Sequence, residues 1–116
     1  MKGSGIFDNA MKLLGYTDSS GEIQDSTGLK ARATAAINRI IADLKLNIFI
    51  EKLTDEISIS QSGEDALIYG TAMLLALSDN DGSKNQLFAS IYNAKRSAFR
   101  GNKTFVKDNL PVANEV

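Results

Sequence analysis

Residues 66–77 read Ala-Leu-Ile-Tyr-Gly-Thr-Ala-Met-Leu-Leu-Ala-Leu, and this stretch decides the fold. Ser62, a candidate N-cap, precedes it and is followed by acidic residues that favour the positive end of a helix dipole. The stretch is apolar almost all round, which is typical of a helix in the middle of a domain. We therefore predict a central helix over residues 63–78. Gly70 should cost roughly 1 kcal/mol relative to Ala there, so we expect another helix to pack closely against it.

Three further helices are expected around this one. Residues 29–46 show the clearest amphipathic pattern, with Ala and Ile side chains at spacings of three and four on one side and charged residues on the other. Residues 5–15 carry a shorter apolar stripe that ends at a glycine, a common residue at a helix C-terminus. Residues 83–99 carry a stripe that begins after a turn, where Asp81 or Ser83 could cap the helix.

The connections differ in character. Residues 16–28 form a polar, hydroxyl-rich loop, in which Ser26 or Thr27 could cap the next helix. Residues 47–61 are long for a connection in a compact domain, and loops of this length are functional or need other contacts to order them. The alternation Ile-Ser-Ile-Ser at 57–60 is a weak strand signal, so we expect an extended loop with a short β-like piece.

These patterns predict an all-α protein, a small bundle of about four helices. With 116 residues, 43% hydrophobic and 23% charged, the chain fits one globular domain. We place that domain at residues 1–100 and a flexible basic tail at residues 101–116. No stretch approaches the roughly 20 apolar residues that a membrane span needs, so no membrane partner is expected.

Composition argues against most catalysis. The chain has no Cys and no His, which removes the usual transition-metal ligands, the Ser-His-Asp and Cys-His nucleophiles and the commonest general base. Residues 79–82, Asp-Asn-Asp-Gly, suggest a calcium loop, but the register would place Leu77 and Phe88 where the EF-hand needs carboxylates. We therefore expect no enzyme activity, no metal and no cofactor.

Charge is unevenly distributed along the chain. Residues 1–83 hold seven basic and twelve acidic side chains, whereas residues 84–116 hold six basic and two acidic ones. Such blocks mark a contact surface for an acidic partner or for phosphates, or they form only a solvated helix face. The candidate interface residues of this block are Lys84, Lys95, Arg96, Arg100, Lys103 and Lys107.

Two tyrosines lie on apolar helix faces. Tyr69 and Tyr92 are expected in the core with their hydroxyl groups satisfied, rather than in a binding role. Together with Gly70 they form the predicted helix-packing set.

The stretch from Tyr69 to Gly82, followed by Gln-Leu-Phe-Ala at 86–89 and Tyr-Asn-Ala-Lys-Arg at 92–96, resembles a known hairpin. It is similar to the C-terminal helical hairpin of the head-tail connector (head-completion, neck adaptor) proteins of tailed bacteriophages and prophages. The start at 7–16 resembles their opening helix. The helix at 29–46, with the Phe and extended segment after it, resembles their second helix and protruding loop.

The resemblance covers roughly residues 6–100 and implies a structural adaptor. It implies a small helical protein, often monomeric in isolation, that assembles as a homo-oligomeric ring between the portal protein and the tail or stopper proteins. It implies a place in the neck of the virion, and in the bacterial host cytoplasm during assembly. DNA would pass through the ring without sequence-specific binding, and no catalytic residues or cofactor are implied.

Loop and tail segments of the family reach neighbouring subunits or the portal, and residues 47–61 and 100–116 match them here. Phe49, Ile57 and Ile59 therefore join the candidate interface. The leading expectation is a ring-forming head-tail connector. The alternative is a small helical nucleic-acid-binding or regulatory protein that uses the basic C-terminal block.

Overall fold

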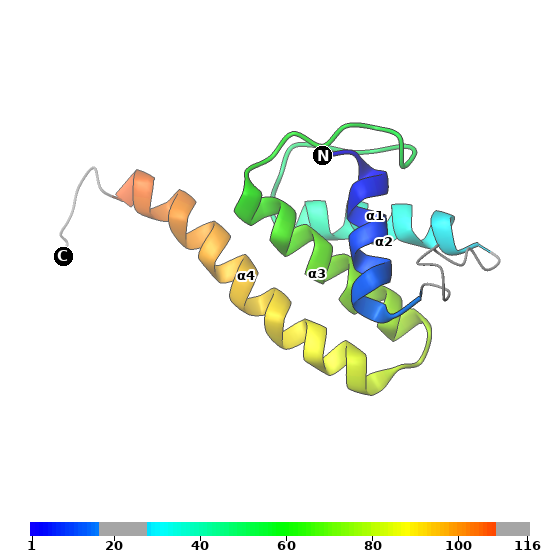
Figure 1. The fold of residues 1–116 in the computed structure, drawn as a ribbon. Helices are drawn as coiled ribbons and strands as arrows, with labels where there is room; N and C mark the ends of the chain where they lie inside the picture. The colour runs from blue at the N-terminus through cyan, green and yellow to red at the C-terminus, as the bar shows by residue number, and fades with distance from the viewer. Residues whose placement is uncertain (17–27, 109–116) are drawn as a thin grey trace.

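The computed structural model describes the backbone of residues 1–16 and 28–108 and the side chains of residues 1–16 and 28–100. It contains the helices α1 (Gly3–Leu14), α2 (Leu29–Asp43), α3 (Gln61–Ser78) and α4 (Gly82–Asp108) (Figure 1). The described residues contain no strand, only an isolated antiparallel bridge between Lys2 and Glu56. The predicted all-α class with four helices is confirmed.

Helix α3 is the centre of the fold, as its apolar sequence predicts. It contacts each of the other three helices, and it pairs most extensively with α4 in an antiparallel hairpin (Figure 1). Helices α1 and α2 also touch each other. Since α2 and α4 both pack on α3, they form the two sides of one face of the molecule.

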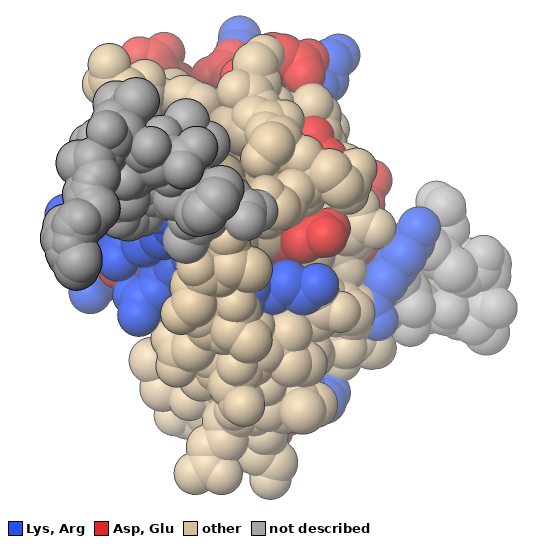
Figure 2. Space-filling view, turned by 90° about the vertical axis from the view of Figure 1, so that its left-hand side faces the viewer, with Lys and Arg blue, Asp and Glu red and all other residues tan. Residues whose placement is uncertain are grey.

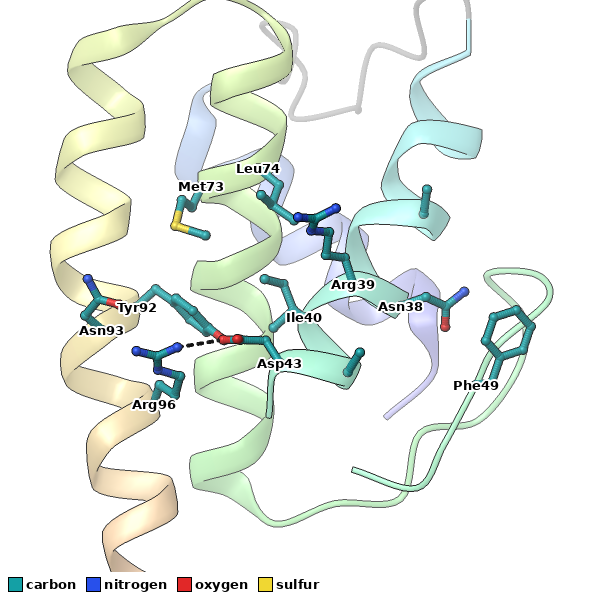
Figure 3. Close-up of a pocket in the computed structure, with 12 residues that line it drawn as sticks. Asn38, Arg39, Ile40, Asp43, Phe49, Met73, Leu74, Tyr92, Asn93 and Arg96 are labelled. Atoms are coloured by element: carbon teal, nitrogen blue, oxygen red, sulfur yellow. Dashed lines mark hydrogen bonds and ion pairs between the residues drawn. The ribbon is translucent and has the colours of Figure 1, made fainter. Parts of the chain in front are cut away.

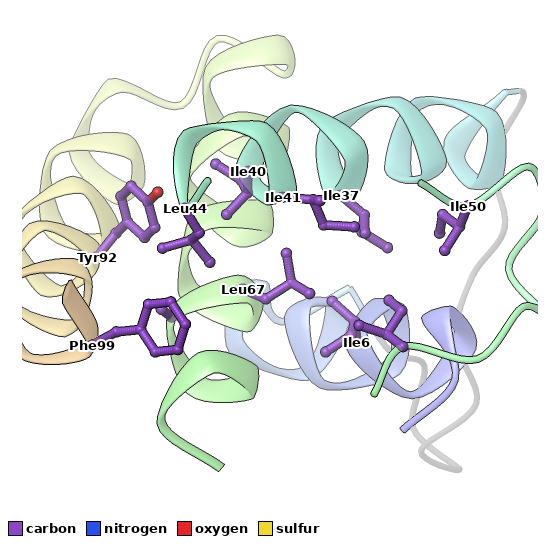
Figure 4. Close-up of a cluster of buried hydrophobic side chains, with 11 residues drawn as sticks. Ile6, Ile37, Ile40, Ile41, Leu44, Ile50, Leu67, Tyr92 and Phe99 are labelled. Carbon is purple, nitrogen blue, oxygen red and sulfur yellow. The ribbon is translucent and has the colours of Figure 1, made fainter. Parts of the chain in front are cut away.

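The core consists of two neighbouring apolar clusters. One joins all four helices and the loop after α2 through residues that include Ile6, Ile41, Leu67 and Phe99 (Figure 4). The other joins α1, the start of α2, α3 and the first half of α4, and it includes Phe88. The predicted stripes of α1 and α2 are therefore buried. That of α4 is buried only in part, because Phe88, Tyr92 and Phe99 enter the core whereas Leu87 is exposed.

Helix α2 packs closely against α3 at Gly70. A Cβ atom at this position would lie 2.9 Å from each of three side-chain atoms of Ile40. The expectation that another helix packs closely on Gly70 is confirmed, because the missing side chain leaves room for a β-branched residue of the neighbouring helix.

Tyr69 and Tyr92 lie at the α3–α4 interface region of the core. The ring of Tyr69 is 6.1 Å from that of Phe88, and Tyr69 is partly buried against both clusters. Tyr92 is 3% exposed and its hydroxyl donates a hydrogen bond to Asp43. The prediction of a core tyrosine with a satisfied hydroxyl is confirmed for Tyr92.

The ends of α3 and α4 differ from the prediction in detail. The N-cap of α3 is Ser60, whose hydroxyl accepts from the backbone N–H of Gly63 at 3.2 Å. The prediction of Ser62 was wrong by two residues, because Ser62 lies inside the first turn of the helix. Asp81 caps the start of α4 by accepting from the N–H of Lys84. Helix α4 continues to Asp108, well past the predicted end at residue 99.

Residues with a left-handed backbone conformation lie at the ends of α1 and α2. Gly15 has φ 78°, and the N–H of Tyr16 reaches back to the carbonyl of Met11, which closes α1 as predicted. Helix α2 ends at Asp43 rather than at residue 46, because Lys45 adopts φ 60° and breaks the helix. Gly28 is the N-cap of α2.

The loop between α2 and α3 is extended, and its Ile-Ser alternation at 57–60 has a simple explanation. Ile57 is fully buried and Ile59 partly buried, whereas Ser58 and Ser60 are exposed. The segment alternates between core and solvent without pairing into a strand. The polar segment 17–27, with the capping candidates Ser26 and Thr27, and residues 109–116 lie outside the described residues.

Among the described helices, none combines the length and the apolar character that crossing a bilayer requires.

Candidate functional site

A groove of about 920 Å³ runs between α2 and α4, with α3 as its floor (Figure 3). Its lining is apolar at the centre and polar at the rim. The residues that line it are Ala35, Asn38, Arg39, Ile40, Ala42 and Asp43 from α2, Phe49 from the following loop, Met73 and Leu74 from α3, and Tyr92, Asn93 and Arg96 from α4.

A clamp around Asp43 joins the two walls of the groove at one end. The carboxylate Oδ2 of Asp43 accepts from the hydroxyl of Tyr92 at 2.5 Å and from Nη1 of Arg96 at 3.0 Å. The guanidinium of Arg100 donates to the backbone carbonyl of Asp43. The end of α2 is thus attached to three successive turns of α4, and Figure 3 shows Tyr92 and Arg96 beside Asp43.

The clamp fixes the protonation states of its members. The hydrogen bonds from Tyr92 and then from Arg96 hold the pKa of the Asp43 carboxyl below its usual value, although partial burial opposes them. Burial, and then the bond to Asp43, raise the pKa of the Tyr92 phenol. Near neutral pH Asp43 stays charged and Tyr92 stays neutral. Their hydrogen bond, which attaches α2 to α4, is therefore kept at this pH.

The loop after α2 contributes Phe49 to the lining of the groove. The side-chain amide of Asn38 donates to the backbone carbonyl of Ile50 at 2.7 Å, and its oxygen accepts from the N–H of Ile50 at 2.9 Å. Ile50 is 1% exposed, whereas Phe49 is 71% exposed. Because neighbours in an extended chain point to opposite sides, anchoring Ile50 in the core directs Phe49 outward.

The same loop is tied down further along. The carboxylate of Asp55 accepts from the backbone N–H groups of Glu51 and Lys52, which lowers its pKa. The loop carbonyls of Leu53 and Asp55 accept from the first N–H groups of α1. The contacts that a loop of this length needs are therefore present.

The predicted loop interface is only partly available. Phe49 is exposed, as a contact residue should be. Ile57 is 0% exposed and belongs to the core, so its selection as an interface residue is corrected: its side chain completes the packing under α2 and α3. Ile59 is partly buried against the same cluster.

The basic block contacts its own chain. Lys84 donates to the carbonyl of Leu14 at 2.7 Å, and Lys95 lies 5.6 Å from the centre of the Tyr69 ring. Arg96 and Arg100 belong to the Asp43 clamp described above. Lys84 also lies 3.8 Å from Asp81, three residues earlier in the chain, whereas Lys95, Arg96 and Arg100 find their partners only through the fold. Lys103 and Lys107 lie in the last turns of α4, where side chains are not described.

A second network, which the sequence did not indicate, fixes the turn between α3 and α4. Asp79 accepts from the hydroxyl of Tyr16 at 2.7 Å and from Arg32 at 2.8 Å, and Arg32 also bonds Ser78. Arg32 and then Tyr16 lower the pKa of Asp79, and burial followed by the bond to Asp79 raises the pKa of Tyr16 to about 12. Within residues 1–16 and 28–100, no three acidic side chains converge as a metal site would require.

Uncharged surface extends beyond the groove. Between Lys84 and Lys95 the sequence of α4 holds no charged residue, and Leu77 and Leu87 are 60% and 56% exposed. Figure 2 shows charged side chains gathered in the upper and middle parts of one face, while the lower part carries almost none. The molecule therefore presents more apolar surface than Phe49 alone.

Sequence reasoning selected Phe49, Tyr92 and Arg96 but did not place them in one site. Their common groove depends on the packing of α2 and α4 against α3, for which no local sequence pattern exists. Comparison of the chain with protein-family models, with curated proteins and with solved structures gives no match.

Proposed function

We propose that this chain is a structural adaptor of a tailed-phage or prophage virion, a ring-forming head-tail connector between the portal vertex and the tail. The observation that carries the proposal is the groove between α2 and α4. Its floor is apolar, and the exposed ring of Phe49 stands at its edge. An exposed apolar surface with a polar rim is typical of a protein–protein contact.

The ionisable groups of the groove support contact rather than catalysis. A general acid or base works best when its pKa lies near the working pH. In the clamp, the pKa of Asp43 is lowered and that of Tyr92 is raised, away from neutrality. With no His or Cys in the chain, little remains that could carry a reaction.

The hairpin from Tyr69 to Arg96 resembles that of head-tail connector proteins, and this resemblance is the basis for proposing which assembly the chain joins. The helical fold and the loop that carries Phe49 agree with what the resemblance implies. In this proposal the partners are the portal protein and the tail or stopper proteins. The ring surrounds the DNA channel in the virion neck, after assembly in the host cytoplasm.

The alternative, nucleic-acid binding through the basic block, has less support. Lys84, Lys95, Arg96 and Arg100 already contact groups of their own chain, so binding phosphates would compete with these contacts. A filter-binding titration against salt separates the two functions. Steep salt dependence with micromolar affinity would favour nucleic acid, and negligible binding near physiological salt would favour the adaptor.

The direct experiment mixes the purified chain with its cognate portal protein. Analytical ultracentrifugation and electron microscopy then look for a co-sedimenting species and for rings stacked on the portal, with each protein alone as the control. The proposal expects both. No association under any assembly condition would reject it.

A further inference from the structure

The groove between α2 and α4 has an open apolar floor on α3. Met73 and Leu74 line it and are half-buried, and Leu77, three residues further along α3, is 60% exposed. Residues three and four apart lie on the same side of a helix, so Leu77 extends this floor past the end of the groove. The part of the chain that the structure describes leaves these three side chains accessible to a ligand.

The walls of the groove favour a helical ligand. They are helices themselves, with Ala35 and Ala42 exposed on α2 and Asn93 exposed on α4. Because the backbone polar groups of a helix are bonded within it, the walls offer no edge to which an extended strand could bind. A helix satisfies its own backbone and needs only side-chain contacts. From Ala35 to Asp43 the groove is roughly 12 Å long, which matches about two turns of a docked helix.

The charge of the groove favours an acidic ligand. The charged residues that line it are Arg39, Asp43 and Arg96, two cations and one anion. Asp43 pairs with Arg96 at 3.0 Å, whereas no ion pair of the described residues involves the exposed Arg39. In Figure 3 the side chain of Arg39 extends from α2 toward Leu74 on the floor. A ligand that covers the floor is therefore selected if it also brings a carboxylate to Arg39.

We propose that the groove binds an acidic amphipathic helix of the partner protein. Apolar side chains of that helix pack on Met73, Leu74 and Leu77, and one of its carboxylates pairs with Arg39. This inference rests on the proposed function, in which the partner is the portal protein, and it names the chemistry by which that partner is recognised. Over two turns, the apolar residues of the docked helix recur at spacings of three and four, with Asp or Glu at the edge of the same face.

Paired substitutions in the full-length chain test both contacts against the purified portal protein, with nucleic acid removed from each. Arg39→Glu should raise the dissociation constant at least about tenfold, and Lys12→Glu, the same charge change at an exposed site on α1, should change it less than about twofold. Leu77→Ser should weaken binding at least about fivefold, and Leu87→Ser, at a side chain 56% exposed on α4, should not. Thermal unfolding of the four variants should stay close to that of the wild type, because all four side chains are exposed.

Photocross-linking identifies the docked segment itself. Ala31 is exposed one turn before Ala35 and does not line the groove. Because the chain has no Cys, a benzophenone can be attached to Ala31→Cys alone. We expect it to label a helical portal segment that carries Asp or Glu beside apolar residues at spacings of three and four. Ser90→Cys, exposed on α4 outside the groove lining, is the control and should not label that segment.

A charge swap then tests the ion pair. Changing the acidic residue of the labelled portal segment to Arg should weaken binding to the wild-type chain. The same portal variant should bind Arg39→Glu at least about tenfold more tightly than the unchanged portal does, because the swap restores an attractive pair.

The outcomes separate this inference from the proposed function. Portal binding that responds equally to Arg39→Glu and Lys12→Glu would overturn the docked acidic helix and leave the adaptor intact. A labelled portal segment without a carboxylate would do the same. Labelling of the chain's own residues 109–116 or of a second copy, in place of the portal, would also overturn it. A wild-type chain that does not bind the portal would overturn both.

Discussion

Asn38 on α2 exchanges two hydrogen bonds with the backbone of Ile50, one through each polar atom of its amide. The side-chain amide of Asn38 thus pairs with the backbone of Ile50 as a residue on a neighbouring β-strand would. It anchors the loop after α2, and it sets which of two neighbouring residues enters the core. The exposure of Phe49 is thus a consequence of the anchor and not of a loose loop.

Removing the anchor should loosen the loop. Asn38→Ala is expected to lower the free energy of unfolding by about 1–3 kcal/mol, from two hydrogen bonds at about 0.5–1.5 kcal/mol each. Hydrogen exchange at the Ile50 amide should accelerate, because its acceptor is lost. Asn93→Ala, at an exposed position on α4, is the control. Unchanged exchange at Ile50 in Asn38→Ala would show that the anchor is not needed.

Phe49 and Ile50 should respond in opposite ways to truncation. Phe49→Ala is expected to change the free energy of unfolding by less than about 0.5 kcal/mol, since its side chain is 71% exposed. Ile50→Ala should cost about 2–5 kcal/mol, because its side chain is buried. Chemical denaturation of both variants provides the comparison. Equal losses would mean that Phe49 serves the fold and not a contact.

Gly70 should not tolerate even a methyl group. Ala favours a helix over Gly by about 1 kcal/mol, but the added Cβ would overlap Ile40. Overpacking costs about 1–3 kcal/mol, so Gly70→Ala is expected to lose up to about 2 kcal/mol net, measured by urea unfolding. Gly82→Ala, where no atom lies within 4 Å of the added Cβ, is the matched control and should be neutral or slightly stabilising.

The overlap with Ile40 can be separated from other effects of the methyl group. In a chain that already carries Ile40→Ala, Gly70→Ala should lose its cost, because the atoms that it meets are gone. A cost that persists in that background would contradict the packing explanation.

The Asp43 clamp predicts a pH dependence. The pKa of Asp43 is lowered in the folded protein by Tyr92 and Arg96, so its contribution to stability is complete above the usual Asp pKa of about 3.9. It is lost as the pH falls through the folded value. Asp43→Asn should therefore be less stable than the wild type at pH 7, and the difference should disappear in acid.

Urea unfolding at a series of pH values measures this difference. Asp79 and Asp55 also have lowered pKa values, so the wild type loses further stability in the same range and Asp43→Asn keeps that part. Asp8→Asn, an exposed position on α1, is the control. Parallel curves for the wild type and Asp43→Asn would contradict the clamp.

The sequence was sufficient for elements whose signal is local. The apolar run around Gly70 predicted both a central helix and its close neighbour, and Gly15 marked a real helix end. Ile57 was misjudged, because an alternating extended segment reads the same whether its apolar side faces a partner or its own core. Lys45 ended α2 early through a left-handed conformation that no residue type there signals.

The groove could not be predicted, since its walls come from α2 and α4, which meet only through α3 and the Asp43 clamp. The basic block shows the same limit. Arg96 has no acidic neighbour in the sequence near it, yet the fold places it 3.0 Å from Asp43 on another helix. Charge patterning along a chain predicts where cations lie, but not which of them stay free.

The central claim is that the groove between α2 and α4 is a contact surface for assembly, and a steric block tests it most directly. Ala35 is exposed and lines the groove, and Ala31, one turn earlier on α2, is exposed and does not line it. Sedimentation of Ala35→Trp and Ala31→Trp, each with the portal, is the measurement. Both variants should unfold like the wild type; Ala31→Trp should assemble normally, and Ala35→Trp should assemble at least about tenfold more weakly, about 1.4 kcal/mol. Equal assembly of the two folded variants would contradict the account.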